Sequence, residues 1–330
     1  MKLLKFPLLV QEQILKSMGY RQLFFLSYAS NRTKQMIQMF KFNLMNFKFM
    51  FFDDGVKVTF QDSDFRKCVI CLIRNYQVGA VSSEVNDITY GDDRIFNSMI
   101  FTRKNDDSDV LLDIQKHIFE LFSKSPYLYF TVLFFEIKFY RYLPNVKKLG
   151  LSEESVKVED VEELIRKHSD LQSLIIYKDM VGDISPESNI FQLNVFSIQY
   201  PSRPFTDFTD HYKGRYVEFC AQKQEDAQLF LKKWLRKECC DNLKHALIFL
   251  PKGQRFYRSI LVYFEEKQWD INTMSEIYPY DKEIAYYAGT RPANFLCKGA
   301  HYAERFDGKV AMARVFENFM FFSAWDQRPW

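Results

Sequence analysis

The first 45 residues carry apolar side chains at the spacing of short helices. A first helix is predicted from about Pro7 to Met18, because Pro suits the first turn of a helix and no Gly occurs before Gly19. Gly19 is expected to cap the C-terminus of that helix. A short second helix follows, and Ser30 is expected to be the N-cap of a third. The residues spaced to share one face of the third helix are Thr33, Ile37, Phe40 and Leu44.

After residue 46, apolar side chains recur at every second position, whereas before it they recur about every fourth. Phe and Val alternate with other residues on both sides of Asp53-Asp54-Gly55, which is a strong signal for a β-hairpin. Residues 68–73 are typical of a further buried strand, and residues 84–94 and 104–109 of loops. A helix is predicted next, with one apolar face formed by Leu111, Ile114, Ile118, Leu121 and Phe122.

Short apolar strands then recur every 20 to 30 residues between positions 143 and 249. Two patterned helices separate some of them, one around Glu159 to His168 and one around Ala227 to Leu235. Such units each expose an apolar face that only a neighbour can cover, so the strands are expected to stack into a curved sheet with helices outside. The predicted fold class is therefore α+β or α/β, with three N-terminal helices followed by a hairpin-containing, irregular leucine-rich-repeat-like α/β body.

Composition narrows the class of protein. The 330 residues are 47% hydrophobic and 17% aromatic, with 11 Gly and 10 Pro, which excludes disordered and collagen-like chains. The six cysteines follow no secretory signal, so a reducing compartment, cytoplasmic or nuclear, is expected. The most apolar stretch, residues 127–135, is about half the length of a membrane helix, and no membrane association is expected.

The net charge of +3 is unevenly distributed. Residues 1–50 hold eight basic residues and only Glu12 as an acid, a charge of +7, so the other 280 residues carry −4. A basic N-terminal region indicates an acidic partner, because complementary charges steer association. An acidic protein, a nucleic acid and a membrane surface are the candidates at this point.

Residues that carry out chemistry are few and scattered. Cys68-x-x-Cys71 has no second pair at zinc-site spacing, and Cys239-Cys240 has no partner pair. The five histidines are dispersed, and no phosphate-binding Gly loop or nucleophile elbow occurs. We therefore expect no catalytic residue, no metal, no cofactor and no enzymatic activity.

The N-terminal pattern is nevertheless familiar. Phe6-Pro7-Leu8, the Ile14-Leu15 pair and the Ser30-x-Arg32-x-Lys34 tail resemble an F-box, in particular that of the expanded nematode F-box families. The resemblance implies that this region binds a Skp-type adaptor and, through it, a cullin scaffold. The residues that match the adaptor-facing pattern are Phe6, Pro7, Leu8, Ile14, Leu15, Leu23, Leu26, Ser30 and Arg32.

Most of residues 110–330 resembles the type-2 F-box-associated region of nematode F-box proteins. Leu143-Pro144-Asn145-Val146, the helix containing Trp234 and the tail Arg305-x-Asp307-Gly308-Lys309 carry this likeness. It implies an F-box-like domain at 1–45, a substrate-binding region at 46–330, and a substrate-recognition subunit of an SCF-type ubiquitin ligase that binds an unidentified target protein. Two alternatives stay open: a stand-alone leucine-rich interaction protein and, with less support, a nucleic-acid-binding protein.

Overall fold

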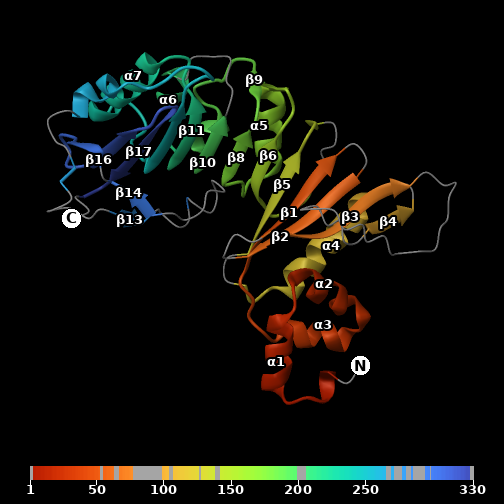
Figure 1. The fold of residues 1–330 in the computed structure, drawn as a ribbon. Helices are drawn as coiled ribbons and strands as arrows, with labels where there is room; N and C mark the ends of the chain where they lie inside the picture. The colour runs from red at the N-terminus through yellow and green to blue at the C-terminus, as the bar shows by residue number, and fades with distance from the viewer. Residues whose placement is uncertain are drawn as a thin grey trace. The chain divides into compact units, whose positions relative to one another are not determined.

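The computed structural model describes most of the chain and divides it into two compact units, residues 1–147 and 148–330 (Figure 1). We call these unit 1 and unit 2 and describe each by itself. The described residues are 3–52, 55–62, 67–76, 99–103, 107–125, 128–137, 142–198, 206–264, 269–270, 277–279, 284, 294–297 and 299–327.

Three helices open unit 1, as the sequence predicted: α1 (Leu8–Ser17), α2 (Tyr20–Ala29) and α3 (Asn31–Gln38), after a short 3₁₀ turn, η1 (Leu3–Lys5). Ser30 is the N-cap of α3, and its Oγ accepts from the backbone N–H of Thr33 at 3.2 Å. The expectation for Gly19 was wrong. Gly19 has φ −69° and is the N-cap of α2, whereas Met18 caps the end of α1.

The predicted hairpin and helix of unit 1 are confirmed. Strands β1 (Leu44–Phe52) and β2 (Gly55–Asp62) are antiparallel, with Phe52 opposite Gly55, so Leu44 belongs to a strand and not to the third helix. Helix α4 (Asp107–Leu121) forms as predicted, and all five residues of the predicted apolar face are buried, the last of them, Phe122, directly after the helix. With β3 (Lys67–Tyr76), β4 (Met99–Arg103) and β5 (Tyr129–Phe134), the strand order is β5–β1–β2–β3–β4.

The main sheet of unit 2 joins a parallel half to an antiparallel half. Its strand order is β15–β16–β17–β12–β11–β10–β8–β6, and neighbours from β6 to β12 are parallel. The parallel strands are β6 (Val146–Leu151), which belongs to unit 2 from residue 148 on, β8 (Ser173–Ile176), β10 (Val195–Ile198), β11 (Tyr216–Cys220) and β12 (His245–Phe249). The antiparallel strands are β15 (His301–Glu304), β16 (Val310–Val315) and β17 (Phe319–Trp325).

The connecting segments form the rest of unit 2. They include α5 (Val158–Lys167), α6 (Thr206–Thr209), α7 (Gln224–Leu235), η3 (Asn189–Gln192) and η4 (Arg258–Phe264). Two small sheets pair β7 (Ser155–Lys157) with β9 (Asp179–Val181) and β13 (Ile277–Pro279) with β14 (Asn294–Leu296).

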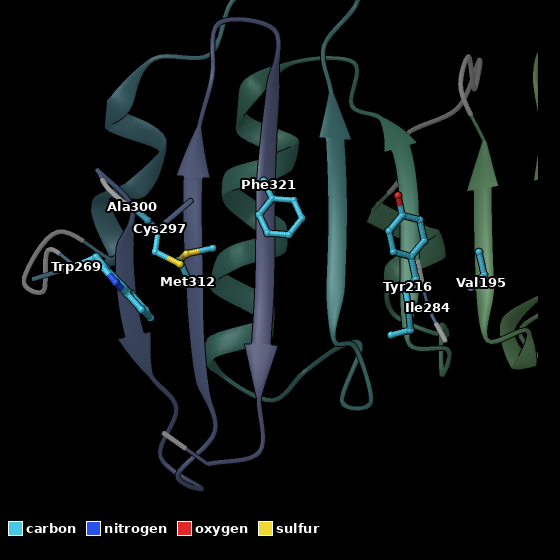
Figure 2. Packing of buried hydrophobic residues seen from close by; sticks show 8 residues of the cluster. All are labelled: Val195, Tyr216, Trp269, Ile284, Cys297, Ala300, Met312 and Phe321. Atoms are coloured by element: carbon cyan, nitrogen blue, oxygen red, sulfur yellow. The ribbon is translucent and has the colours of Figure 1, made fainter. Parts of the chain in front are cut away.

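Helices cover one face of this sheet. The ring of Phe196 in β10 stacks on Phe208 of α6 at 4.6 Å, and Phe322 of β17 contacts Trp234 of α7 at 5.1 Å. The opposite face holds a separate apolar cluster, in which Trp269, Ile284, Cys297 and Ala300 pack with residues of β10, β11, β16 and β17 (Figure 2). Its eight buried members are Val195, Tyr216, Trp269, Ile284, Cys297, Ala300, Met312 and Phe321.

The protein is thus a mixed α/β fold with three N-terminal helices. The expected division at residue 45 falls inside unit 1, and the narrower F-box and leucine-rich-repeat descriptions stay predictions. The loop expected at 84–94 lies outside the described residues. Of the loop expected at 104–109, the described residues 107–109 instead form the first turn of α4.

Candidate functional site

An apolar segment is exposed where α1 begins. Phe6, Leu8 and Leu9 keep 48%, 53% and 66% of their surface accessible, and Pro7 between them is also exposed. Pro7 is the N-cap of α1, and its carbonyl accepts from the N–H groups of two residues of the first turn at 3.0 Å. Large apolar side chains, which are normally buried in a protein core, therefore face solvent next to one another here. Such a cluster is typical of an interaction surface.

The first turn of α1 is held in place by a side chain. Gln11 Nε2 donates to the carbonyl of Phe6 at 2.7 Å, which joins the residue before the N-cap to the first turn of the helix. Further along, Lys16 pairs with Glu12 at 2.6 Å on the polar side of α1. The exposed apolar segment is thus part of an ordered helix start with a defined polar flank.

The nine predicted adaptor-facing residues fall into three groups. Leu15 and Leu23 are fully buried and belong to the core formed by α1, α2 and α3, which we call the head. Ile14 and Leu26 are half-buried. The exposed group is Phe6, Pro7, Leu8, Ser30 and Arg32.

Ser30 and Arg32 differ in what they do. Ser30 is a structural cap, because its Oγ accepts from the Thr33 N–H and also lies 2.8 Å from the hydroxyl of Thr33. Arg32, on the first turn of α3, makes no hydrogen bond or ion pair with any residue that the structure describes. Of these two, Arg32 alone has a side chain that is both exposed and uncommitted.

Helices α2 and α3 are fixed to α4 by polar contacts. Ser27 Oγ lies 2.6 Å from His117 Nε2, and Lys34 Nζ pairs with Glu120 at 2.6 Å. The ring of Tyr28 stacks on that of His117 at 4.2 Å. The face of the head that contains these residues is therefore already occupied by α4, which leaves the start of α1 as the candidate docking surface.

The electrostatics of this junction follow from its geometry. Burial lowers the pKa of His117, and the nearby charge of Lys34 lowers it further, while Glu120 opposes the shift. The Lys34 ammonium, which donates to Glu120, lowers the pKa of that carboxyl. A neutral imidazole beside a Lys–Glu pair is consistent with a structural role for His117.

Sequence reasoning missed Leu9, Tyr28 and His117. Leu9 could have been found, since it lies within the Phe6-Pro7-Leu8-Leu9 run. The spacing of apolar residues in the helix, however, does not assign it to a particular face. The contact of His117 with Ser27 and Tyr28 joins residues about 90 positions apart, and no local pattern announces such a contact.

Other chemistry-bearing groups do not assemble. Within the described ranges no three His, Cys, Asp or Glu side chains are placed to hold a metal ion. Cys239 and Cys240 are buried free thiols, and Cys240 Sγ lies 3.2 Å from the carbonyl of Thr209. The motif Cys68-x-x-Cys71 falls within β3, as the predicted strand requires.

Comparison with known proteins adds no relative. No protein-family model, curated protein or solved structure matches this chain. In the described part of the chain, no helix has the length and apolar character needed to cross a bilayer.

Proposed function

We propose that this chain is a non-catalytic, substrate-recruiting subunit of an SCF-type ubiquitin ligase. The exposed Phe6-Pro7-Leu8 segment at the start of α1 carries the proposal, because it combines the F-box-like motif with apolar side chains that the head does not bury. In this role the head binds a Skp-type adaptor, which is joined to a cullin scaffold. The rest of the chain holds a target protein.

The mechanism of such a subunit is proximity. Holding a target near a ubiquitin-loaded enzyme raises the effective concentration of its lysines without any bond chemistry by this chain. The junction between the head and α4 supports this role, since it ties the docking helices to unit 1 through Ser27, Lys34 and their partners. Binding the adaptor would therefore fix the position of unit 1.

The test is co-purification of the full chain with a Skp-type adaptor. Replacing Phe6 and Leu8 together by Asp should abolish it, since each change is expected to cost about 2 kcal/mol or more at a buried interface. Leu15 is not a suitable target, because Leu15→Asp would place a carboxylate in the fully buried core of the head.

The matched control replaces two exposed apolar residues of unit 2, Val181 and Val262, by Asp. This variant should bind the adaptor like the wild type. Adaptor binding by a folded Phe6→Asp, Leu8→Asp variant at wild-type level would contradict the proposal. If neither adaptor nor cullin co-purifies with the wild type, a stand-alone interaction protein is the better description.

A further inference from the structure

A carboxylate lies on the helix-free face of the unit 2 sheet. Phe219 in β11 points toward α7, where its ring contacts Phe230 at 6.3 Å. Because successive side chains of a strand point to opposite faces, Glu218 lies on the other face. The register of β10 and β11 places Ser197 beside Glu218 on that face. Both residues lie in the parallel half of the sheet.

Glu218 is half-buried but has no contacting cation. Its carboxylate accepts one long hydrogen bond, from the hydroxyl of Tyr216 at 3.3 Å. Among the described residues it forms no ion pair, although the charge of Lys148 on β6 acts on it from a distance. Buried carboxylates are normally paired, so this acceptor has capacity left over.

Two hydroxyl groups near Glu218 also lack partners. Ser197 Oγ is fully buried and makes no hydrogen bond of normal geometry in the described part of the chain, although it lies close enough to the Glu218 carboxylate to lower the pKa of that group. Tyr177, which directly follows β8, is close enough for the charge of Glu218 to raise the pKa of its phenol, and its hydroxyl bonds to no described residue. A buried polar group without a well-formed hydrogen bond, such as Ser197 Oγ, is rare, and a ligand is one reason for it.

Electrostatics at this place favour an added positive charge. Burial raises the pKa of Glu218, while the hydroxyls of Tyr216 and Ser197 and the charge of Lys148 only partly offset that effect. Burial is also the larger cause of the raised pKa of Tyr177. A donor-rich cation would satisfy the carboxylate and give both hydroxyls a partner.

We propose that Glu218, Ser197 and Tyr177 form a binding site for an arginine side chain of the protein that this chain recruits. A guanidinium offers five donors in a planar fork, which matches a carboxylate flanked by hydroxyl acceptors better than a point charge does. Tyr177 and Ser197 lie toward the carboxyl ends of β8 and β10, the edge at which parallel sheets bind ligands, and Glu218 lies beside them in the middle of β11. That the ligand belongs to a target protein rests on the proposed function.

The experiment selects peptides from a random displayed library on the immobilised full chain. Selected peptides should share an arginine at one position. A synthetic selected peptide should then bind the wild type at least tenfold more tightly than its citrulline counterpart, which has the same shape without the charge. Calorimetric titration of both peptides measures this ratio.

Variants assign the effect to the site. Glu218→Gln should weaken the arginine peptide at least tenfold and abolish the preference over citrulline, and Tyr177→Phe should weaken it less. The matched control, Glu187→Gln, changes an exposed acid of unit 2 and should bind like the wild type. Thermal unfolding of each variant checks folding, which Glu218→Gln should preserve because Gln has the same size.

The outcome separates this site from the adaptor proposal. No shared arginine, or equal binding of the arginine peptide to wild type and folded Glu218→Gln, would overturn the site. Glu218→Gln should co-purify with the adaptor like the wild type. If the wild type does not bind the adaptor but still prefers the arginine peptide, the proposed function is wrong and the arginine site is supported.

Discussion

At the scale of single residues, His168 shows how burial sets a pH dependence. It caps the end of α5, where burial, and to a lesser degree the charge of Lys167, lowers its pKa to about 4. The unfolded chain therefore binds a proton at higher pH than the folded chain does. Stability should be fully present above pH ~6.5 and fall as the pH drops toward 4, by up to about 3 kcal/mol.

The measurement is urea unfolding between pH 4 and 7 of the wild type and of His168→Gln. The variant should lose part of the pH dependence in this interval, because Gln does not titrate. His211, an exposed histidine, provides the control, and His211→Gln should leave the curve unchanged. A His168→Gln curve as steep as that of the wild type would show that other groups govern the acid response.

Arg305 is the second residue whose burial has a large consequence. Its side chain is fully buried, its guanidinium pairs with Asp241 at 2.6 Å and with Asp307 at 2.7 and 2.8 Å, and it lies 4.9 Å from the Trp234 ring. The paired guanidinium holds the pKa of Asp307 well below its usual range. These contacts join the β15–β16 turn to the segment after α7.

We predict that Arg305→Met lowers the free energy of unfolding by about 2 kcal/mol, since it removes the charge-assisted hydrogen bonds of a buried guanidinium, although the two carboxylates that it leaves are partly exposed to water. Arg255→Met is the control, because its pair with Glu317 is exposed and should contribute less than about 1 kcal/mol. Denaturant unfolding of both variants makes the comparison. Similar losses in the two would mean that the burial of Arg305 adds nothing.

At the scale of elements, two adjacent phenylalanines in α2 differ in how deeply they are buried. Phe24 is fully buried and contacts Phe60 of β2 at 6.2 Å and His117 of α4 at 5.8 Å, whereas Phe25 is half-buried. Phe24→Ala should cost about 3 to 5 kcal/mol through the cavity that it leaves. Phe25→Ala should cost clearly less, and equal losses in thermal unfolding would contradict this account.

Elements with a long or strict period could be predicted from the sequence. The predicted face of the 15-residue α4, with Phe122 directly after the helix, is buried, and the hairpin forms where it was expected, with Phe52 opposite Gly55. Short elements were harder. Gly19 was assigned to the wrong helix, because the caps of α1 and α2 are the adjacent residues Met18 and Gly19 and a glycine suits both positions. The three-residue strands β7 and β9 are too short to show a period.

The candidate surface was predictable only in part. In α1, Leu8 and Leu15 look alike in the sequence, since both fit an apolar helix face, yet one is exposed and the other fully buried. Which of them is core depends on where α2 and α3 contact α1, and that is a property of the tertiary fold. Glu218 was missed for a related reason: the groups that act on its carboxylate, Tyr216, Ser197 and Lys148, lie on three different strands.

At the scale of the whole molecule, the division into units differs from the expected boundary at residue 45. Three short helices cannot bury enough apolar surface to be stable alone. Here they gain that surface within unit 1, where Tyr20 and Phe42 both contact Phe122, the residue that follows α4. The F-box-like region stays a prediction as a functional module, and its stability is that of unit 1.

The uneven charge of the chain leads to a prediction about binding kinetics. Of the eight basic residues among the first 50, Lys16 and Lys34 are engaged in ion pairs with Glu12 and Glu120. Lys5 and Arg32 are exposed and free to attract an acidic adaptor. Because exposed charges act mainly on encounter, raising the salt concentration from 50 to 500 mM should slow association about tenfold and change dissociation little.

Stopped-flow association of the full chain with a Skp-type adaptor tests this. Lys5→Glu with Arg32→Glu should slow association at low salt and flatten its salt dependence. The apolar change Phe6→Asp with Leu8→Asp should act mainly by speeding dissociation, since most effects of buried contacts appear in that rate. Lys252→Glu, an exposed charge of unit 2, is the control. A salt-independent association rate would show that the basic head does not steer the encounter.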